Sequence, residues 1–161
     1  MRQGELGNCW FLSAISSLAE HAERVERLFR NSHKGPNEFG IYGVNICKNG
    51  QWTDIVIDDW IPVRNGEPVF SRAQGSELWV LLLEKAWAKL HGSYHSIENG
   101  LAITALRDLT GAPCFLYKIA KEDKQKLWEM MSQGDKKDYI MAIASQPTEP
   151  QEIEIIKKAG I

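Results

Sequence analysis

The sequence has 161 residues, 43% of them hydrophobic, and its 19 basic and 21 acidic side chains leave a formal net charge of −2. This balance gives no electrostatic reason to expect a nucleic-acid partner, and no apolar run approaches the length of about 18 residues that a membrane span needs. The three cysteines are widely spaced and form no disulfide framework, and the first residues lack an apolar leader. We therefore expect a cytoplasmic protein.

The N-terminal segment predicts two helices. Asn8 can cap a helix over 9–19, in which apolar residues such as Ile15 and Leu18 recur at helical spacing. A second, short and charged helix is expected over 23–30.

A β-hairpin is expected next. Apolar runs over 39–46 and 52–57 flank Asn49-Gly50, a dipeptide that favours a tight two-residue turn. Asn65-Gly66 predicts a second turn shortly afterwards.

The second half of the chain is mostly helical. Ser76 can cap a long helix that places Glu77 in its first turn and ends at Gly92. Further helices are expected over 101–109 and 122–131, a buried strand over 139–144, and one or two amphipathic turns over 148–160. The sequence thus predicts an α+β fold in two units, 1–118 and the beginning of a second at 119–161.

Cys9 is the first candidate for chemistry. A thiol in the first turn of a helix lies at the positive end of the dipole, beside free N–H groups that favour the nucleophilic thiolate. The same N–H groups can hold an oxyanion, and the amide of Gln3, six residues earlier, could join them. A lone cysteine at this place could equally be a small buried hydrophobe.

Four motifs in order resemble the calpain family of cytosolic, calcium-dependent cysteine endopeptidases. They are Gln3-Gly4-Glu5-Leu6-Gly7-Asn8-Cys9-Trp10, the strand over 52–59 with its paired aspartates, the helical segment over 74–94, and Leu109-Thr110-Gly111. The resemblance implies a papain-like fold, with Cys9 as nucleophile, Gln3 as an oxyanion-hole donor and Trp10 packed beside the sulfur. It also implies that 1–118 is the first protease subdomain and 119–161 the start of the second.

The resemblance further implies a calcium ligand at Glu77. Gly75-Ser76-Glu77 matches the family's Gly-Asn-Glu, with Ser in place of Asn. Calcium takes six to eight oxygen ligands, and the family's other ligands fall partly upstream of Gln3. We therefore expect an incomplete calcium site in this chain.

The catalytic base is missing from the sequence. In papain-like enzymes a histidine follows the nucleophile by about 130–150 residues, and no histidine follows His95 here. His91 and His95 do not form a zinc motif, because Gly92-Ser93 interrupts the helix. We expect an endopeptidase that acts on protein substrates. Its catalytic base lies in the rest of the second subdomain, so we expect this chain alone to be inactive.

Two other functions remain open at this point. A non-catalytic calpain-like interaction or regulatory module would share all four motifs. A different acyltransferase with a cysteine nucleophile would share the chemistry at the helix start but not the match over 74–94.

Overall fold

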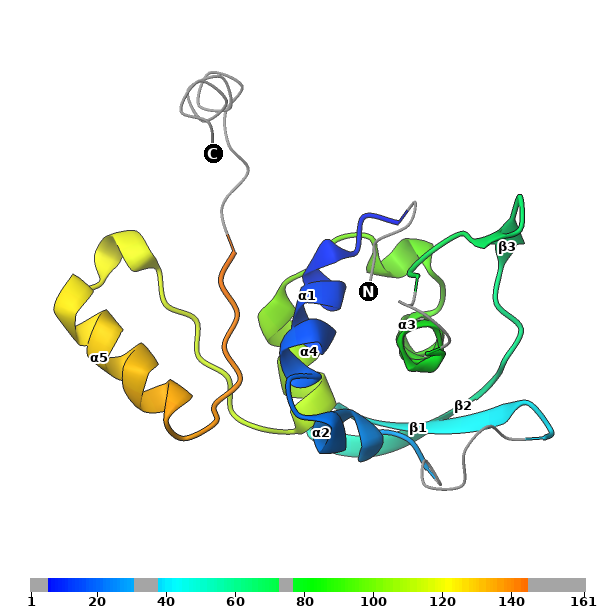
Figure 1. Cartoon of the computed structure of the whole chain (residues 1–161), viewed down its shortest axis with the longest axis horizontal. Helices are drawn as coiled ribbons and strands as arrows, with labels where there is room; N and C mark the ends of the chain where they lie inside the picture. The colour runs from blue at the N-terminus through cyan, green and yellow to red at the C-terminus, as the bar shows by residue number, and fades with distance from the viewer. Residues whose placement is uncertain (1–5, 31–37, 73–76, 145–161) are drawn as a thin grey trace, which may run out of the picture.

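The computed structural model describes residues 6–30, 38–72 and 77–144, and its element order is α+β, as the sequence predicts (Figure 1). The elements are α1 (Cys9–Leu18), α2 (Ala22–Glu26), β1 (Ile41–Lys48), β2 (Gln51–Asp58), β3 (Val63–Arg64), β4 (Glu67–Pro68), α3 (Trp79–His91), η2 (His95–Ile97), α4 (Ala102–Thr110), η3 (Ile119–Lys121) and α5 (Lys124–Asp135).

The core lies between three helices and a hairpin. Helices α1, α3 and α4 bury their apolar faces against one another and against the antiparallel pair β1–β2 (Figure 1). Phe11 of α1 stacks on Trp87 of α3 with ring centroids 5.0 Å apart. Burial of these large aromatic surfaces gives much of the driving force that fixes α1 against α3.

The hairpin follows from its turn. Lys48 pairs with Gln51, and both turn residues have left-handed backbones, with φ of 52° at Asn49 and 79° at Gly50. Asn and Gly tolerate this region best, and their twist matches that of the flanking strands. The predicted hairpin is confirmed, with Val44 among the fully buried residues of its inner face.

Helix α2 is shorter than predicted because the chain after it joins the sheet. The N–H of Asn45 donates to the carbonyl of Leu28 (2.7 Å), and Arg30 donates to Gly43 (2.9 Å). Phe29 forms an isolated antiparallel bridge with Val44. Pairing with β1 thus replaces the last turns of the expected helix.

Helix α3 begins later than the sequence predicts. Its first residue is Trp79 and Leu78 occupies the N-cap position, so the expectation that Glu77 lies in the first turn is wrong. Ser76, the predicted cap, lies outside the described residues. Glu77 and Leu78 are both exposed, and without packing against the core a further turn is not stabilised. The helix ends before Gly92 (φ 100°), as predicted.

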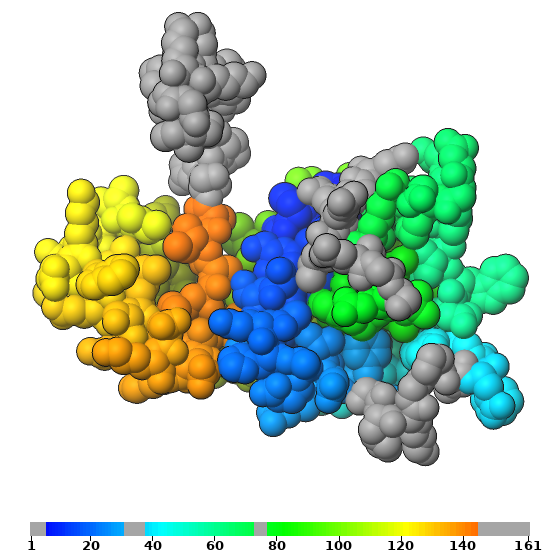
Figure 2. Space-filling model, viewed as in Figure 1, coloured from blue at the N-terminus to red at the C-terminus, as the bar shows by residue number. Residues whose placement is uncertain are grey.

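Residues 115–144 form an arm beside this core. Helix α5 lies apart from α1–α4, and the chain after it returns beside α1 (Figures 1 and 2). The predicted helix is confirmed as α5, whose first turn is capped by the Asp123 carboxylate accepting from the N–H of Lys126 (2.9 Å). Contacts with the core include Arg24, whose guanidinium donates to the carbonyl of Asp138, and half-buried Ile140.

The predicted buried strand over 139–144 is wrong. These residues form no strand, and Tyr139 and Ile143 are 61% and 69% exposed. A strand requires a neighbouring strand to satisfy its backbone groups, and the described part of the chain pairs none with this segment. The amphipathic turns expected over 148–160 lie outside the described residues. Across the described ranges, no helix combines the length and apolarity required to cross a bilayer.

Candidate active site

Cys9 is the first residue of α1, and its thiol is free and exposed. The first hydrogen bonds of the helix are donated by Phe11 and Leu12 to the carbonyl of Asn8, at 2.9 and 3.1 Å. The N–H groups of Cys9 and Trp10 precede these bonds and lie at the positive end of the helix. An accessible sulfur beside such N–H groups is the arrangement that nucleophilic attack on a carbonyl needs. Gln3 lies outside the described residues.

Asn8 occupies the predicted N-cap position but does not cap with its side chain. Its Nδ2 instead donates to Oε1 of Glu84 on α3, at 2.6 Å. Its Oδ1 is buried and has no hydrogen-bond partner among the described residues. Because a carboxylate only accepts, this contact fixes which way the Asn8 amide points.

Glu84 is a functional candidate that the sequence reasoning missed. Its side chain is 2% exposed, and Oε2 accepts from both the N–H and the Oγ of Ser71, at 3.0 and 2.7 Å. The signal was present: Glu84 lies four residues after Val80 and three before Trp87, on the buried face of α3. A buried carboxylate needs hydrogen-bond donors from within the protein. Here Asn8 and Ser71 provide them, from two segments that are distant in sequence.

Trp10 follows the candidate nucleophile and ties α1 to η2. Its Nε1 donates to the carbonyl of Ile97 at 3.1 Å, and its ring meets Trp87 edge-on with centroids 6.2 Å apart. Gly100 lies against this ring, where a Cβ would come within 2.6 Å of it. Trp10 is the second residue of α1 and follows Cys9 directly, and the packing of its ring beside the sulfur stays a prediction.

The histidines that the structure describes have partners other than Cys9. The ammonium of Lys48 lies 2.8 Å from Nε2 of His91, whose Nδ1 lies 2.9 Å from the carbonyl of Trp87. Lysine only donates, so Nε2 accepts and Nδ1 carries the proton. His21 lies near two carboxylates, and the exposed His95 lies near Glu98. None of these three is paired with the Cys9 sulfur.

Lys48 also neutralises a buried carboxylate. Its Nζ donates to Asp108 at 3.1 Å, and Nε of Arg107 donates to the other oxygen at 2.9 Å. Asp108 is fully buried. This cluster joins β1 to α3 and α4 and holds the core together rather than serving the candidate nucleophile.

Asp58, the first of the paired aspartates at the end of β2, has a structural partner in Lys85. Lys85 donates to the Asp58 carboxylate and also to the carbonyls of Asp58 (3.1 Å) and Trp60 (2.7 Å). The hydrogen bond from Lys85, followed by one from the N–H of Trp60, lowers the pKa of Asp58 below its ordinary value. Nearby, burial raises the pKa of Tyr94, and the carboxylates of Glu84 and Asp58 add to this effect.

Glu77, the predicted calcium ligand, is exposed. It contributes at most two oxygens, against the six to eight that calcium takes. No group of three or more His, Cys, Asp or Glu side chains in the described ranges is arranged to hold a metal ion. The carboxylate of Glu77 therefore suits calcium, but the other ligands would have to come from outside the described residues.

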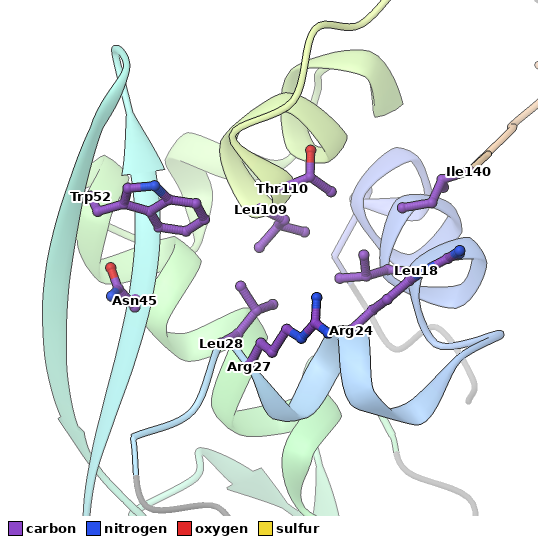
Figure 3. Close-up of a pocket in the computed structure, with 9 residues that line it drawn as sticks. All are labelled: Leu18, Arg24, Arg27, Leu28, Asn45, Trp52, Leu109, Thr110 and Ile140. Carbon is purple, nitrogen blue, oxygen red and sulfur yellow. The ribbon is translucent and has the colours of Figure 1, made fainter. Parts of the chain in front are cut away.

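A surface hollow of about 650 Å³ lies at the end of α1 opposite Cys9 (Figure 3). A helix of 10 residues is roughly 15 Å long, which separates this hollow from the candidate nucleophile. Its lining residues come from both the core and the arm: Leu18, Arg24, Arg27, Leu28, Asn45, Trp52, Leu109, Thr110 and Ile140. None of the predicted catalytic residues is among them.

The comparison with known families is decisive. A model of the family described as "Calpain family cysteine protease" matches residues 1–161. The chain belongs to the calpain family. The predicted family, and with it the papain-like α+β fold class, is confirmed.

Calpains of plants and animals are among its relatives. The chain is 53% identical over 112 residues to the calpain-type cysteine protease ADL1 of Oryza sativa subsp. japonica, covering 68% of this chain and 5% of that protein. It is 50% identical over 151 residues to the calpain-type cysteine protease DEK1 of Arabidopsis thaliana (89% and 7%), and 35% identical over 156 residues to the calpain-2 catalytic subunit of Gallus gallus (96% and 22%). This calpain chain therefore spans less than a quarter of the length of each of these three relatives.

Proposed function

We propose that the protein to which this chain belongs is a cysteine endopeptidase that cuts protein substrates, with Cys9 as its nucleophile. The observation that carries the proposal is the exposed, free thiol at the first residue of α1 in a chain of the calpain family. Cys47 is buried, and burial raises the pKa of the partly buried Cys114. Cys9 is thus the cysteine best placed for attack.

The proposed reaction is acyl transfer in two steps. The Cys9 sulfur attacks the substrate carbonyl, a thioester forms, the C–N bond breaks, and the amine leaves with the proton taken from the thiol. Water then hydrolyses the thioester, which releases the acid and restores the thiol. The N–H of Cys9, together with the side-chain amide of Gln3, would stabilise the oxyanion of each tetrahedral intermediate.

The base that takes the proton belongs, in this proposal, to the remainder of the second subdomain. The division into 1–118 and 119–161 stays part of the proposal, and two features support a base that lies outside the described residues. The described histidines have other partners, and the arm exposes large apolar side chains. These include Phe115, Leu116, Trp128, Tyr139 and Ile143. Apolar surface on this scale is typical of a face that another part of the protein covers.

Calcium and a cytoplasmic location complete the proposal. Calcium, if bound at Glu77 with oxygens from outside the described residues, would supply a fixed positive charge that holds chain segments together. The free thiols of the described cysteines fit a reducing compartment.

The test is hydrolysis of a fluorogenic peptide by the protein that carries this chain within a complete protease core, with and without calcium. We expect hydrolysis that Cys9→Ser abolishes and that Cys114→Ser leaves unchanged. The isolated 161-residue chain should hydrolyse nothing, because none of the described histidines is paired with Cys9. If the complete protein has no activity that depends on Cys9, it is a non-catalytic calpain-like module and the proposal is wrong.

A further inference from the structure

We propose that Glu84 is a positioning residue for Cys9, acting through Asn8. This inference rests on the proposed function, since it concerns how the nucleophile and its N–H group are held. Glu84 lies on α3, 76 positions from Asn8, and the two side chains meet in a buried hydrogen bond of 2.6 Å.

Asn8 is held through the amino group of its side chain and through its backbone carbonyl. Its side chain donates to Glu84, and its backbone carbonyl accepts the first two hydrogen bonds of α1, from Phe11 and Leu12. The carbonyl of Asn8 and the N–H of Cys9 belong to the same planar peptide group. Fixing Asn8 therefore fixes the direction of the N–H that would stabilise the oxyanion.

The carboxylate is itself fixed from the other side. Ser71 donates to Oε2 of Glu84 with both its N–H and its hydroxyl, so the carboxylate cannot turn without breaking these two bonds. Ser71 and Glu84 are each no more than 2% exposed, which keeps water from competing for the same atoms. The result is a rigid connection from the loop after β4, through α3, to the residue before the nucleophile.

The chemistry requires a carboxylate at this place. Glu84 accepts three hydrogen bonds from neutral groups of Asn8 and Ser71. Both oxygens of its carboxylate take part. An apolar residue would be cheaper to bury, but it would leave Asn8 without its anchor. We therefore assign the buried carboxylate of Glu84 the role of holding Asn8 in place.

A reversal of the hydrogen bond tests this role. In the complete protease, Asn8→Leu keeps the approximate size of the side chain but removes its donor to Glu84, so that position 8 loses its anchor. The double variant Asn8→Asp with Glu84→Gln restores the contact in the reverse direction, because the amide at position 84 donates to the carboxylate at position 8 while its oxygen still accepts from Ser71. Ile46→Val, a trimmed side chain in the core on β1, serves as a control for a simple loss of stability.

The readout is kcat for a fluorogenic peptide per active site, with sites counted by an irreversible thiol-directed peptide inhibitor. We expect N8L to lower kcat by about 10- to 100-fold, the scale of a misplacement near 1 Å, with little change in KM. The double variant N8D/E84Q should recover most of this loss, and I46V should keep the wild-type kcat despite a lower melting temperature.

The outcomes separate this inference from the proposed function. A wild-type protein without Cys9-dependent hydrolysis refutes the proposed function. An active wild type whose kcat per site is unchanged by N8L refutes the positioning role. A double variant N8D/E84Q no better than N8L also refutes it, because the effect of position 8 would then not depend on its hydrogen bond with position 84.

Discussion

The contact between Gly100 and Trp10 gives a sharp test of how tightly the residue after the nucleophile is held. A Cβ at Gly100 would lie 2.6 Å from both Cε2 and Cζ2 of the Trp10 indole. Carbon atoms in contact normally lie about 3.5–4.0 Å apart. Gly100→Ala therefore forces a movement of about 1 Å on the indole or on the chain that carries Gly100.

The expected cost can be isolated with a second glycine near the same site. A Cβ at Gly7 would meet the carbonyl oxygen of Glu98 at 3.4 Å, an ordinary contact. Neither glycine has a positive φ, so each replacement gains a similar amount from a stiffer unfolded chain, about 0.4–1 kcal/mol. The difference between G100A and G7A is thus the overpacking itself, about 1–3 kcal/mol.

The measurement is urea and thermal unfolding of the wild type, G7A and G100A. We expect G100A to melt below G7A by about 2–12 °C, at about 2–4 °C per kcal/mol for a chain of this size. Trp10→Ala removes all three indole atoms that a Cβ at position 100 would meet, and it should erase most of the difference in a double-mutant cycle. Equal melting temperatures for G7A and G100A would show that Trp10 moves freely and would refute the reasoning.

Three further predictions concern titratable groups of the core. The Lys85 contact lowers the pKa of Asp58, so its stabilising effect is present above the ordinary aspartate pKa, near 4, and is lost as the pH falls through the lower folded value; the unfolding free energies of the wild type and Asp58→Asn should therefore converge as the pH falls below about 4. The pKa of Tyr94 is raised, so its neutral form is favoured and stability should fall as the pH rises above about 10; Tyr94→Phe should flatten this loss in alkaline urea titrations. Asp108→Ala leaves Lys48 without its buried partner and should lower the free energy of unfolding in urea by about 3 kcal/mol. A loss no larger than that of an exposed salt bridge would contradict the view that this pair supports the core.

Local signals in the sequence predicted local structure well. Asn49-Gly50 specifies its turn through backbone geometry alone, and the hairpin formed as expected. The start of α1 at Cys9 was predicted from Asn8 as the N-cap residue before apolar residues at helical spacing, and Asn8 does occupy that position. Such features depend on neighbours within a few positions, which the sequence displays directly.

Features that depend on distant packing were predicted less well. The start of α3 was placed too early because Glu77 looks like a first-turn acid, whereas the helix begins where burial begins. The segment 139–144 has the composition of a buried strand, but composition cannot supply a neighbouring strand. Asn8 was expected to cap with its side chain, yet a buried carboxylate from α3 takes that side chain instead.

The distance in sequence between Asn8 and Glu84 also bears on when the site matures. Cys9 is made early in synthesis, but its anchor on α3 follows only some 75 residues later. Closing so long a loop is entropically costly and occurs only when the aromatic and aliphatic faces of α1 and α3 come together. A nascent or partly unfolded chain therefore carries the thiol without its final geometry, and the peptide cleavage that we propose would have to await the completed core.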